Sequence, residues 1–404
     1  FLYFIAHAMH ALIRSTFRTL LKQSSKVDKD VATRAMLCAS PIQVYDRKTH
    51  EWINFDGAKE WNDSRKVVDG LIRKLNGGRE WYHPVTSTTD SKAPADRGTS
   101  VASFVKETFR NSPNTTHSLN LAFAALKSLN HTLRAAESLN GVAPFVGASF
   151  AWGPSNFKSL QYFQMPEQSG DAVTPGAQLL VAHPLMPGFF RHSVILLHRF
   201  DSEGAFGLIL NRPLTNQEGV IVPVWSALPD SHPLLAKHLA NNAIMVGGPV
   251  THTATMEPSL LCLHKFGSVR DSVPLTRDGT CDVFAGGNMD DMVKLFEENS
   301  AKAEDFVVVL GYSGWGHDQL EGEVARGSWF CTQFLASTEQ TPSPQLSDFV
   351  FRASRSAGSA GLRRVDDPKE TWCSVLSGMG GSFRELTKLH SLSKLQFDDD
   401  DENE

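Results

Sequence analysis

Short apolar runs bounded by glycine, proline or asparagine turns fill the second half of this 404-residue chain. Runs this short, with turn residues at both ends, are typical of buried strands. They occur at 179–182, 194–199, 205–210, 243–246, 260–264, 283–287 and 306–310. The turn at 201–204 joins two runs into a hairpin, and an amphipathic helix is predicted at 290–298. Residues 176–390 are therefore predicted to form an α+β domain.

The first part of the chain has a helical pattern instead. Apolar residues recur at helical spacing at 12–21, 101–110 and 119–137. On the first of these helices Arg14, Arg18 and Lys22 fall every four residues, so they share one slowly turning face. That face is either a docking surface for an acidic partner or a solvated surface.

Composition sets the predicted boundaries and excludes some functions. We predict a helical domain at 9–140, a linker at 141–175, the α+β domain at 176–390 and an acidic, disordered tail at 391–404. The net charge of −5 gives no reason to expect nucleic acid as a partner. The five cysteines are scattered, which suits a reducing compartment. No zinc-ligand spacing appears, and we predict no cofactor and no metal.

The start of the chain bears on its compartment. The sequence begins with Phe1, and Met9 is predicted to be the true start, because the helical pattern begins just after it. The apolar stretch 1–13 is shorter than the roughly 20 residues that span a bilayer. Basic residues before Asp28 suit an organelle transit peptide as well as a simple first helix. We therefore expect a mitochondrial or plastid location, or otherwise a cytoplasmic one.

The helical part contains an aromatic–arginine pair, Phe17-Arg18, followed by Val27-Asp28. With the later Phe109-Arg110, this pattern resembles the LYR-motif family of small three-helix proteins over residues 11–137. Thr16 and Phe17 stand where that family has Leu and Tyr, and the insertion at 40–100 is longer than the family fold needs.

The LYR resemblance implies a mitochondrial adaptor that packs against acyl carrier protein or an assembly client. Its cationic face would then meet acidic helix residues and phosphopantetheine. The residues expected to bind the partner are Arg14, Phe17, Arg18, Lys22, Phe109 and Arg110.

Motif blocks follow one another through the second half of the chain. Their main residues are His183, Pro184, Phe190, Ser193, Asn211, Arg212, Pro213, Gly247, Gly248, Pro249, Gly311, Tyr312, Gly314, Trp315, Gln319 and Glu321. In order and spacing the blocks resemble the AlgH/YqgE family (UPF0301) over residues 176–386. The departures are Pro187-Gly188, where an acidic residue is common, and a longer loop between Trp329 and Trp372.

The AlgH/YqgE resemblance implies an α+β domain whose branched sheet curls into a barrel-like core. It implies no settled activity. Bacterial relatives are labelled transcriptional regulators, but this half of the chain shows no helix-turn-helix and no dense basic helix.

The segment 311–316 raises the question of catalysis. A strand runs into Gly-Tyr-Ser-Gly and a helix-like segment follows, so Ser313 could be a nucleophile with His317 and Asp318 nearby. A nucleophile elbow needs glycine two residues after the serine, where this chain has Trp315. We therefore favour an architectural corner, in which Trp315 fills the core and Gln319 and Glu321 hold backbone donors near a helix start.

Two further clusters have more than one interpretation. Arg212 is predicted either to pair with Glu321 or Glu323 in a buried clamp or to line a small-ligand pocket. His183, His192, His198 and His264 could meet at a metal, but lone strand histidines are usually satisfied by backbone groups. Cys262 and Cys281 are candidates for redox-responsive thiols or for inert buried ones.

These observations favour a non-enzymatic adaptor or regulatory protein. Its helices would dock an acidic protein, and its α+β domain would bind a client or a small ligand. The alternatives are a hydrolase that uses the Ser313/His317 corner and a transcriptional regulator. The sequence does not define the oligomeric state.

Overall fold

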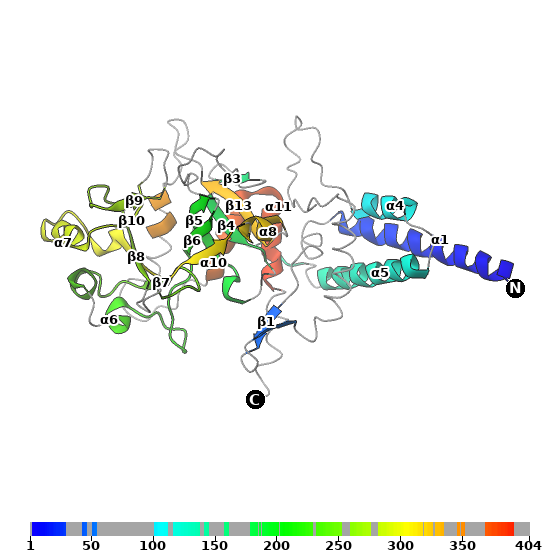
Figure 1. Ribbon diagram of the computed structural model, residues 1–404, viewed down its shortest axis with the longest axis horizontal. Coiled ribbons are helices and arrows are strands. Elements are labelled where there is room, and N and C mark those ends of the chain that lie inside the picture. The colour runs from blue at the N-terminus through cyan, green and yellow to red at the C-terminus, as the bar shows by residue number, and fades with distance from the viewer. Residues whose placement is uncertain are drawn as a thin grey trace.

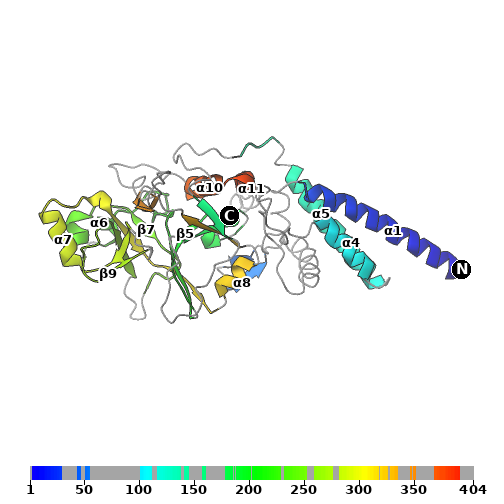
Figure 2. The ribbon, with the colours of Figure 1, turned by 90° about the horizontal axis from the view of Figure 1, so that it is seen from above.

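The computed structural model describes residues 2–29, 43–46, 51–54, 101–111, 116–137, 141–144, 157–160 and 178–391, the last with gaps at 185, 187, 202, 229–231, 253–258, 276–281, 318, 326–327, 335–345, 348 and 352–367. Two sheets with their covering helices occupy one end of the molecule. Three further helices lie together at the other end (Figures 1 and 2).

The larger sheet has six strands and is antiparallel throughout. Its order is β12 (Ser313–Gly316), β6 (Gly204–Ile209), β5 (Val194–Asp201), β4 (Gln178–Ala182), β13 (Trp329–Phe334) and β3 (Phe157–Leu160). β5 and β6 form the predicted hairpin, with an irregularity in register between Leu197 and Arg199. β3 lies within the stretch predicted as a linker at 141–175, so part of that stretch belongs to the sheet.

The smaller sheet has five strands. Its order is β7 (Ile244–Val246), β11 (Phe306–Leu310), β8 (Leu260–His264), β10 (Phe284–Gly286) and β9 (Ser272–Pro274). β7 and β11 run parallel, and the other pairs are antiparallel. The prediction of strands at 243–246, 260–264, 283–287 and 306–310 is confirmed, with ends that differ by one residue.

The two sheets share one core and each has a second core of its own. Side chains alternate along a strand, so Leu179 and Val181 enter the shared core while Leu180 and Ala182 face the opposite side. Burial of both faces explains why these strands read as continuous apolar runs.

Helices cover all three cores. α10 (Pro368–Met379) and α11 (Gly381–Leu386), with the turn η5 (Thr387–Ser391), close the shared core, and the buried Trp372 Nε1 donates to the Ala182 carbonyl at 2.8 Å. α8 (Gln319–Ala325) covers the outer face of the larger sheet. The helices at the smaller sheet are α6 (Val224–Ala227), the π-helical turn η3 (Leu234–His238) and α7 (Met289–Glu297), with the turn η4 (Ala303–Asp305).

The predicted barrel-like closure is wrong. Both sheets are open in the described residues, with β12 and β3 at the edges of one and β7 and β9 at the edges of the other. The chain passes from one sheet to the other instead of curling one sheet onto itself. Ile209 N, at the end of β6, donates to Gly247 O at 2.9 Å, and β11 continues into β12 through Gly311 and Tyr312.

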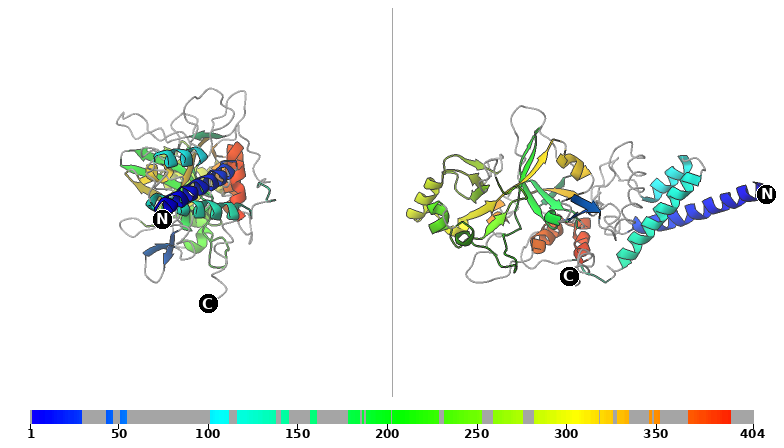
Figure 3. Two further views of the ribbon diagram at one scale, coloured as in Figure 1. Left: turned by 90° about the vertical axis from the view of Figure 1, so that its right-hand side faces the viewer. Right: turned by 60° about the horizontal axis from the view of Figure 1, so that its bottom comes forward.

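The three separate helices are α1 (Leu2–Val27), α4 (Val101–Asn111) and α5 (Thr116–Glu137), in agreement with the predicted helical units. They share an apolar cluster that includes Leu20, Val105 and Leu129. The carboxylate of Asp28 accepts hydrogen bonds from Val101 N and Ala102 N at 2.8 and 3.0 Å, so it caps the start of α4. Figure 3 shows α1 running past the ends of the other two helices.

A short hairpin, β1 (Gln43–Asp46) with β2 (Glu51–Asn54), lies in the predicted insertion. No helix within the described ranges combines the length and apolarity that a membrane span requires.

Candidate functional site

The glycine motifs meet where the two sheets join. A Cβ on Gly248 would overlap the backbone of Tyr312, and a Cβ on Gly247 would lie 2.6 Å from Val309 Cγ1. Gly311 has φ of 74°, a conformation that favours glycine. The structure therefore brings Gly247, Gly248 and Gly311 together as a crossing point of two backbones.

Ser313 lies at this crossing and not on a strand-to-helix elbow. It belongs to β12 and pairs with Gly207 of β6, whereas α8 begins only at Gln319. Its side chain is fully buried, and its hydroxyl donates to Gly247 O at 3.1 Å. The expected helix does follow, as α8, but the rest of β12 comes between it and Ser313, so the strand-to-helix elbow of a serine nucleophile is absent here.

Aromatic side chains gather on the outer face of the larger sheet. Trp315 is 5% exposed, and its ring lies 6.4 Å from Phe190 and 6.1 Å from Trp329. Gln319 Oε1 accepts a hydrogen bond from Gly316 N at 3.1 Å, as expected for a residue that holds a backbone donor. The side chain of Glu321 lies outside the described residues.

Glu323 is the acceptor for this aromatic cluster. Its Oε2 accepts hydrogen bonds from Trp315 Nε1 at 2.9 Å and Trp329 Nε1 at 2.8 Å, and its Oε1 accepts one from Gln319 Nε2 at 3.0 Å. Arg212 was predicted to pair with Glu321 or Glu323. The pairing with Glu323 is wrong, because its carboxylate accepts from two indoles, and the pairing with Glu321 lies outside the described residues. The signal that the sequence offered was a pair of tryptophans, each needing a partner for its N–H.

Asn211 holds the start of β5 to the end of β6. It is buried, and its Oδ1 accepts from Val194 N at 2.9 Å while its Nδ2 donates to His192 O at 2.8 Å. His192 has a φ of 55°, so this amide bridges an unusual backbone turn. Pro213 follows and bridges to Met245 of β7, which carries the chain into the smaller sheet.

Arg212 contacts the turn η2 (Gly188–Phe190) and the residues after it. Its Nη1 donates to Phe189 O, and its Nη2 donates to Arg191 O at 2.9 Å and to Ser193 Oγ at 3.3 Å. The guanidinium carbon lies 4.8 Å from the centre of the Phe189 ring. Burial lowers the pKa of Arg212 to about 10. This cation is therefore held by neutral oxygens and an aromatic ring.

The histidines lie in separate aromatic surroundings. Ring centroids are 5.6 Å apart for His183 and Phe330, 4.7 Å for His192 and Trp372, and 5.7 Å for His198 and Phe206. The part of the chain that the structure describes contains no group of three or more His, Cys, Asp or Glu side chains placed to hold a metal. Pro184 follows His183 directly after the end of β4.

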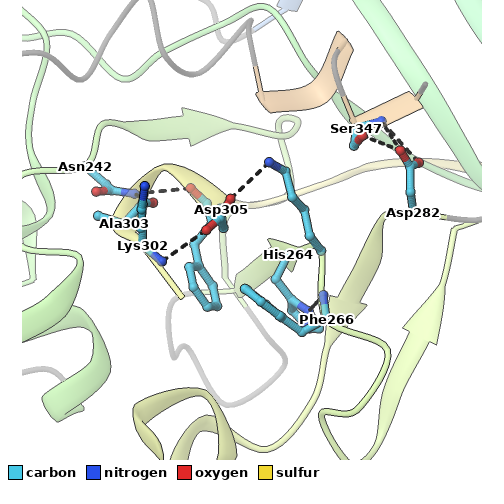
Figure 4. A network of polar contacts seen from close by, with 10 residues as sticks. Asn242, His264, Phe266, Asp282, Lys302, Ala303, Asp305 and Ser347 are labelled. Carbon is cyan, nitrogen blue, oxygen red and sulfur yellow. Dashed lines mark hydrogen bonds and ion pairs between the residues drawn. The ribbon is translucent and has the colours of Figure 1, made fainter. Parts of the chain in front are cut away.

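A second polar network lies in the smaller sheet (Figure 4). The Nε2 of the buried His264 lies 2.9 Å from Gly286 O, and its Nδ1 accepts from Phe266 N at 3.2 Å, so the ring is neutral and protonated at Nε2. Burial lowers the pKa of His264, and the contact with Gly286 opposes that shift. Lys265 Nζ forms an ion pair with Asp305 Oδ1 at 3.0 Å and lies 5.0 Å from the centre of the Phe351 ring.

The same network anchors neighbouring segments. Asn242 Nδ2 donates to Ala303 O and Phe306 O at 2.9 and 3.1 Å, and Asp282 accepts from the backbone and hydroxyl of Ser347. Most of these contacts join one segment to another, which gives the network a structural role. The sequence singled out only His264 of this network, because most of its other members are far apart along the chain.

The cysteines that the structure describes are poor candidates for redox chemistry. Cys262, Cys331 and Cys373 are free and buried. Burial raises the pKa of Cys262 to about 12 and raises the pKa of Cys331 as well. Cys281 lies outside the described residues.

The residues predicted to bind a partner divide between two faces of the helical part. Phe17 and Phe109 face each other with ring centroids 4.9 Å apart, inside the packed side. Arg14, Arg18 and Lys22 are exposed, as is Arg110. The helices therefore present these cations outward and keep Phe17 and Phe109 for packing.

Comparison with known proteins defines the α+β part. A family model described as AlgH-like (DUF179) matches residues 179–357. UPF0301 proteins from Mycolicibacterium smegmatis and Shewanella woodyi are 32% and 31% identical over 167 and 154 residues, which cover 41% and 37% of this chain and 74% and 75% of theirs. The solution structure of AlgH from Pseudomonas aeruginosa matches 47% of this chain and 92% of its own, at 24% identity and a TM-score of 0.30.

The residues that match the family model, 179–357, lie in the two-sheet α+β domain. The chain belongs to the AlgH-like family, UPF0301.

Proposed function

We propose that this protein is a non-enzymatic adaptor whose helical part docks an acidic protein partner and whose AlgH-like domain binds a client or a small ligand. The observation that carries the proposal is the outward face of α1. Arg14, Arg18 and Lys22 are exposed there, and none of them makes an ion pair within the described part of the chain.

The charge of the three helices supports docking to an acidic surface. α1 contains no Asp or Glu in its 26 residues. The acidic residues of α4 and α5 are Glu107 and Glu137. The basic residues of the three helices are Arg14, Arg18, Lys22, Lys26, Lys106, Arg110, Lys127 and Arg134. An excess of one sign on a surface attracts and orients a partner of the other sign.

The LYR resemblance suggests which acidic partner to test first. Acyl carrier protein presents acidic helices, and an assembly client is the alternative. A mitochondrial or plastid location is part of this proposal, and fractionation of the source cells tests it.

Docking is tested with purified holo-acyl carrier protein and the full-length chain. The variant Arg14→Glu/Arg18→Glu/Lys22→Glu should weaken binding by at least about tenfold, with a smaller effect at high salt. The matched control is Lys237→Glu/Lys294→Glu/Lys302→Glu, which reverses the same number of exposed charges on the AlgH-like domain. Equal binding by both variants and the wild type would show that the α1 face does not dock this partner.

The geometry gives no support to the hydrolase alternative. Ser313 is buried and its hydroxyl is engaged with Gly247 O, whereas His317 is exposed. A serine hydrolase needs an accessible hydroxyl that donates to its base. A serine-reactive probe should therefore label the wild type and Ser313→Ala to the same extent.

A further inference from the structure

We propose that Arg212 binds the carboxylate or phosphate group of a small organic anion at the η2 turn. This inference deepens the proposed function, because it assigns a ligand class to the AlgH-like domain. It is independent of the docking face on α1.

The first support is that the described residues offer the charge of Arg212 no counter-charge. No carboxylate lies within ion-pair distance of Arg212 among the described residues, and its hydrogen-bond acceptors there are carbonyl and hydroxyl oxygens. Two other arginines of the domain differ, since Arg199 pairs with Asp201 at 3.2 Å and Arg270 pairs with Asp291 at 2.7 Å. A partly buried cation that lacks an anion carries a desolvation penalty, which a bound anion offsets.

The sequence around the site is free of acids. Residues 178–200, which form β4, η2 and most of β5, contain no Asp or Glu, and neither do residues 204–217. The lowered pKa of Arg212 agrees with this setting, since burial is its cause. An anion that reaches the guanidinium therefore meets no nearby acidic side chain from these two segments.

The second support is the number of donors that remain. A guanidinium has five N–H groups in a planar fork. Within the described residues, the contacts use Nη1 once and Nη2 twice. The Nε–H and one Nη1–H therefore remain for a ligand, and a charge-assisted bond from either would be short and strong.

The third support is the aromatic neighbour. Phe189 is 39% exposed, although its ring lies against the guanidinium. An exposed ring beside a cation suits a ligand with an apolar part next to its anionic group. The backbone carbonyls of Phe189 and Arg191 fix the fork in place, so the donors are oriented before the ligand arrives.

The test uses the full-length chain, titrated at low ionic strength with inorganic phosphate, with benzoate and with benzyl alcohol as the neutral control. We expect phosphate, benzoate or both to saturate the wild type at about 10 mM or below and benzyl alcohol to bind far more weakly. Binding by phosphate alone would assign a phosphate ligand, and binding by benzoate alone would assign a carboxylate. The proposal is overturned if neither anion saturates the chain, or if benzyl alcohol binds as well as benzoate.

Variants assign the binding to Arg212. Arg212→Gln should weaken binding by about tenfold or more, and Arg270→Gln, the matched control, should leave it unchanged. Should Arg212→Gln fail to fold, Arg212→Lys keeps the charge and removes the fork, and it should also bind more weakly. Undiminished binding by the folded Arg212 variant would refute the assignment. The α1 charge-reversal variant should bind anions normally, so this test and the docking test can fail separately.

Discussion

Replacing Glu323 offers the most direct test of how the AlgH-like domain is held together. Its Oε2 accepts both indole N–H groups, of Trp315 and Trp329, at 2.9 and 2.8 Å. In Glu323→Leu both donors lose their acceptor. A donor left unsatisfied on burial costs about 1–3 kcal/mol, so two that are partly buried should cost about 2–4 kcal/mol together.

Glu323→Gln is the matched control. Its amide oxygen can take the place of Oε2 and accept both indole N–H bonds. Its amide nitrogen then faces Gln319, which is exposed and can turn to water. The remaining loss is the change from a charged to a neutral acceptor, which is worth about 1 kcal/mol.

The assay is urea unfolding of the full-length chain, followed by tryptophan fluorescence and by circular dichroism. Both variants should shift the midpoint to lower urea with an unchanged slope, and the leucine variant should shift it two to four times as far, as estimated from about 2–4 against about 1 kcal/mol. If Glu323→Leu were as stable as Glu323→Gln, the two indoles would not depend on this carboxylate and the reasoning would be refuted.

Gly248→Ala should lower the free energy of unfolding by about 2 kcal/mol or more, because a Cβ there overlaps the backbone of Tyr312. The control Gly219→Ala, at a position with φ of 76° and open space, should lower it by about 1 kcal/mol. Thermal unfolding distinguishes the two variants, and equal losses would contradict the close contact at Gly248. Burial lowers the pKa of both His264 and His198, so the folded state resists their protonation: stability is complete above the unfolded pKa of about 6.5 and declines as pH falls toward the folded values. His264→Gln should reduce this acid sensitivity in urea unfolding, and an unchanged pH dependence would count against the neutral ring. Cys262, Cys331 and Cys373 should resist a thiol reagent in the folded chain at about pH 8 and react once it is unfolded, as peptide mapping by mass spectrometry can show; rapid native labelling of Cys262 would contradict its raised pKa.

Seven strands of this domain, β4 to β8 with β10 and β11, could be predicted because each is a short apolar run between turn residues, whereas β3, β9, β12 and β13 were not predicted. Phe306–Leu310 became β11, and the hairpin at Asp201–Gly204 joined β5 to β6, since these features depend on local chemistry. The division of the strands between two sheets could not be predicted. That division depends on pairings such as Ser313 with Gly207, which are distant in sequence.

The barrel-like core and the pairing of Arg212 with Glu323, one of its two predicted partners, were wrong for related reasons. The first prediction took the motif blocks to meet because one sheet curls onto itself, and the second took them to meet through charged side chains. The blocks meet instead through backbone contact, at glycines where a side chain would not fit, and Gly248 against Tyr312 is an example. Residue type showed that a close approach was needed, but it did not show which segment approaches.

The polar residues of the motif blocks differ in whether the fold itself uses their hydrogen-bonding groups. The Asn211 side chain accepts a hydrogen bond from one backbone N–H and donates one to a backbone carbonyl, and the Ser313 hydroxyl donates to Gly247 O. Glu323 accepts three hydrogen bonds from side chains. Groups engaged in this way stabilise the sheet junction and have little capacity left for catalysis. Arg212 is different, because its full charge is matched within the described residues only by dipoles and a ring. Its hydrogen bonds hold the η2 turn, and the charge that these neutral groups leave unpaired is the basis of the anion site proposed above.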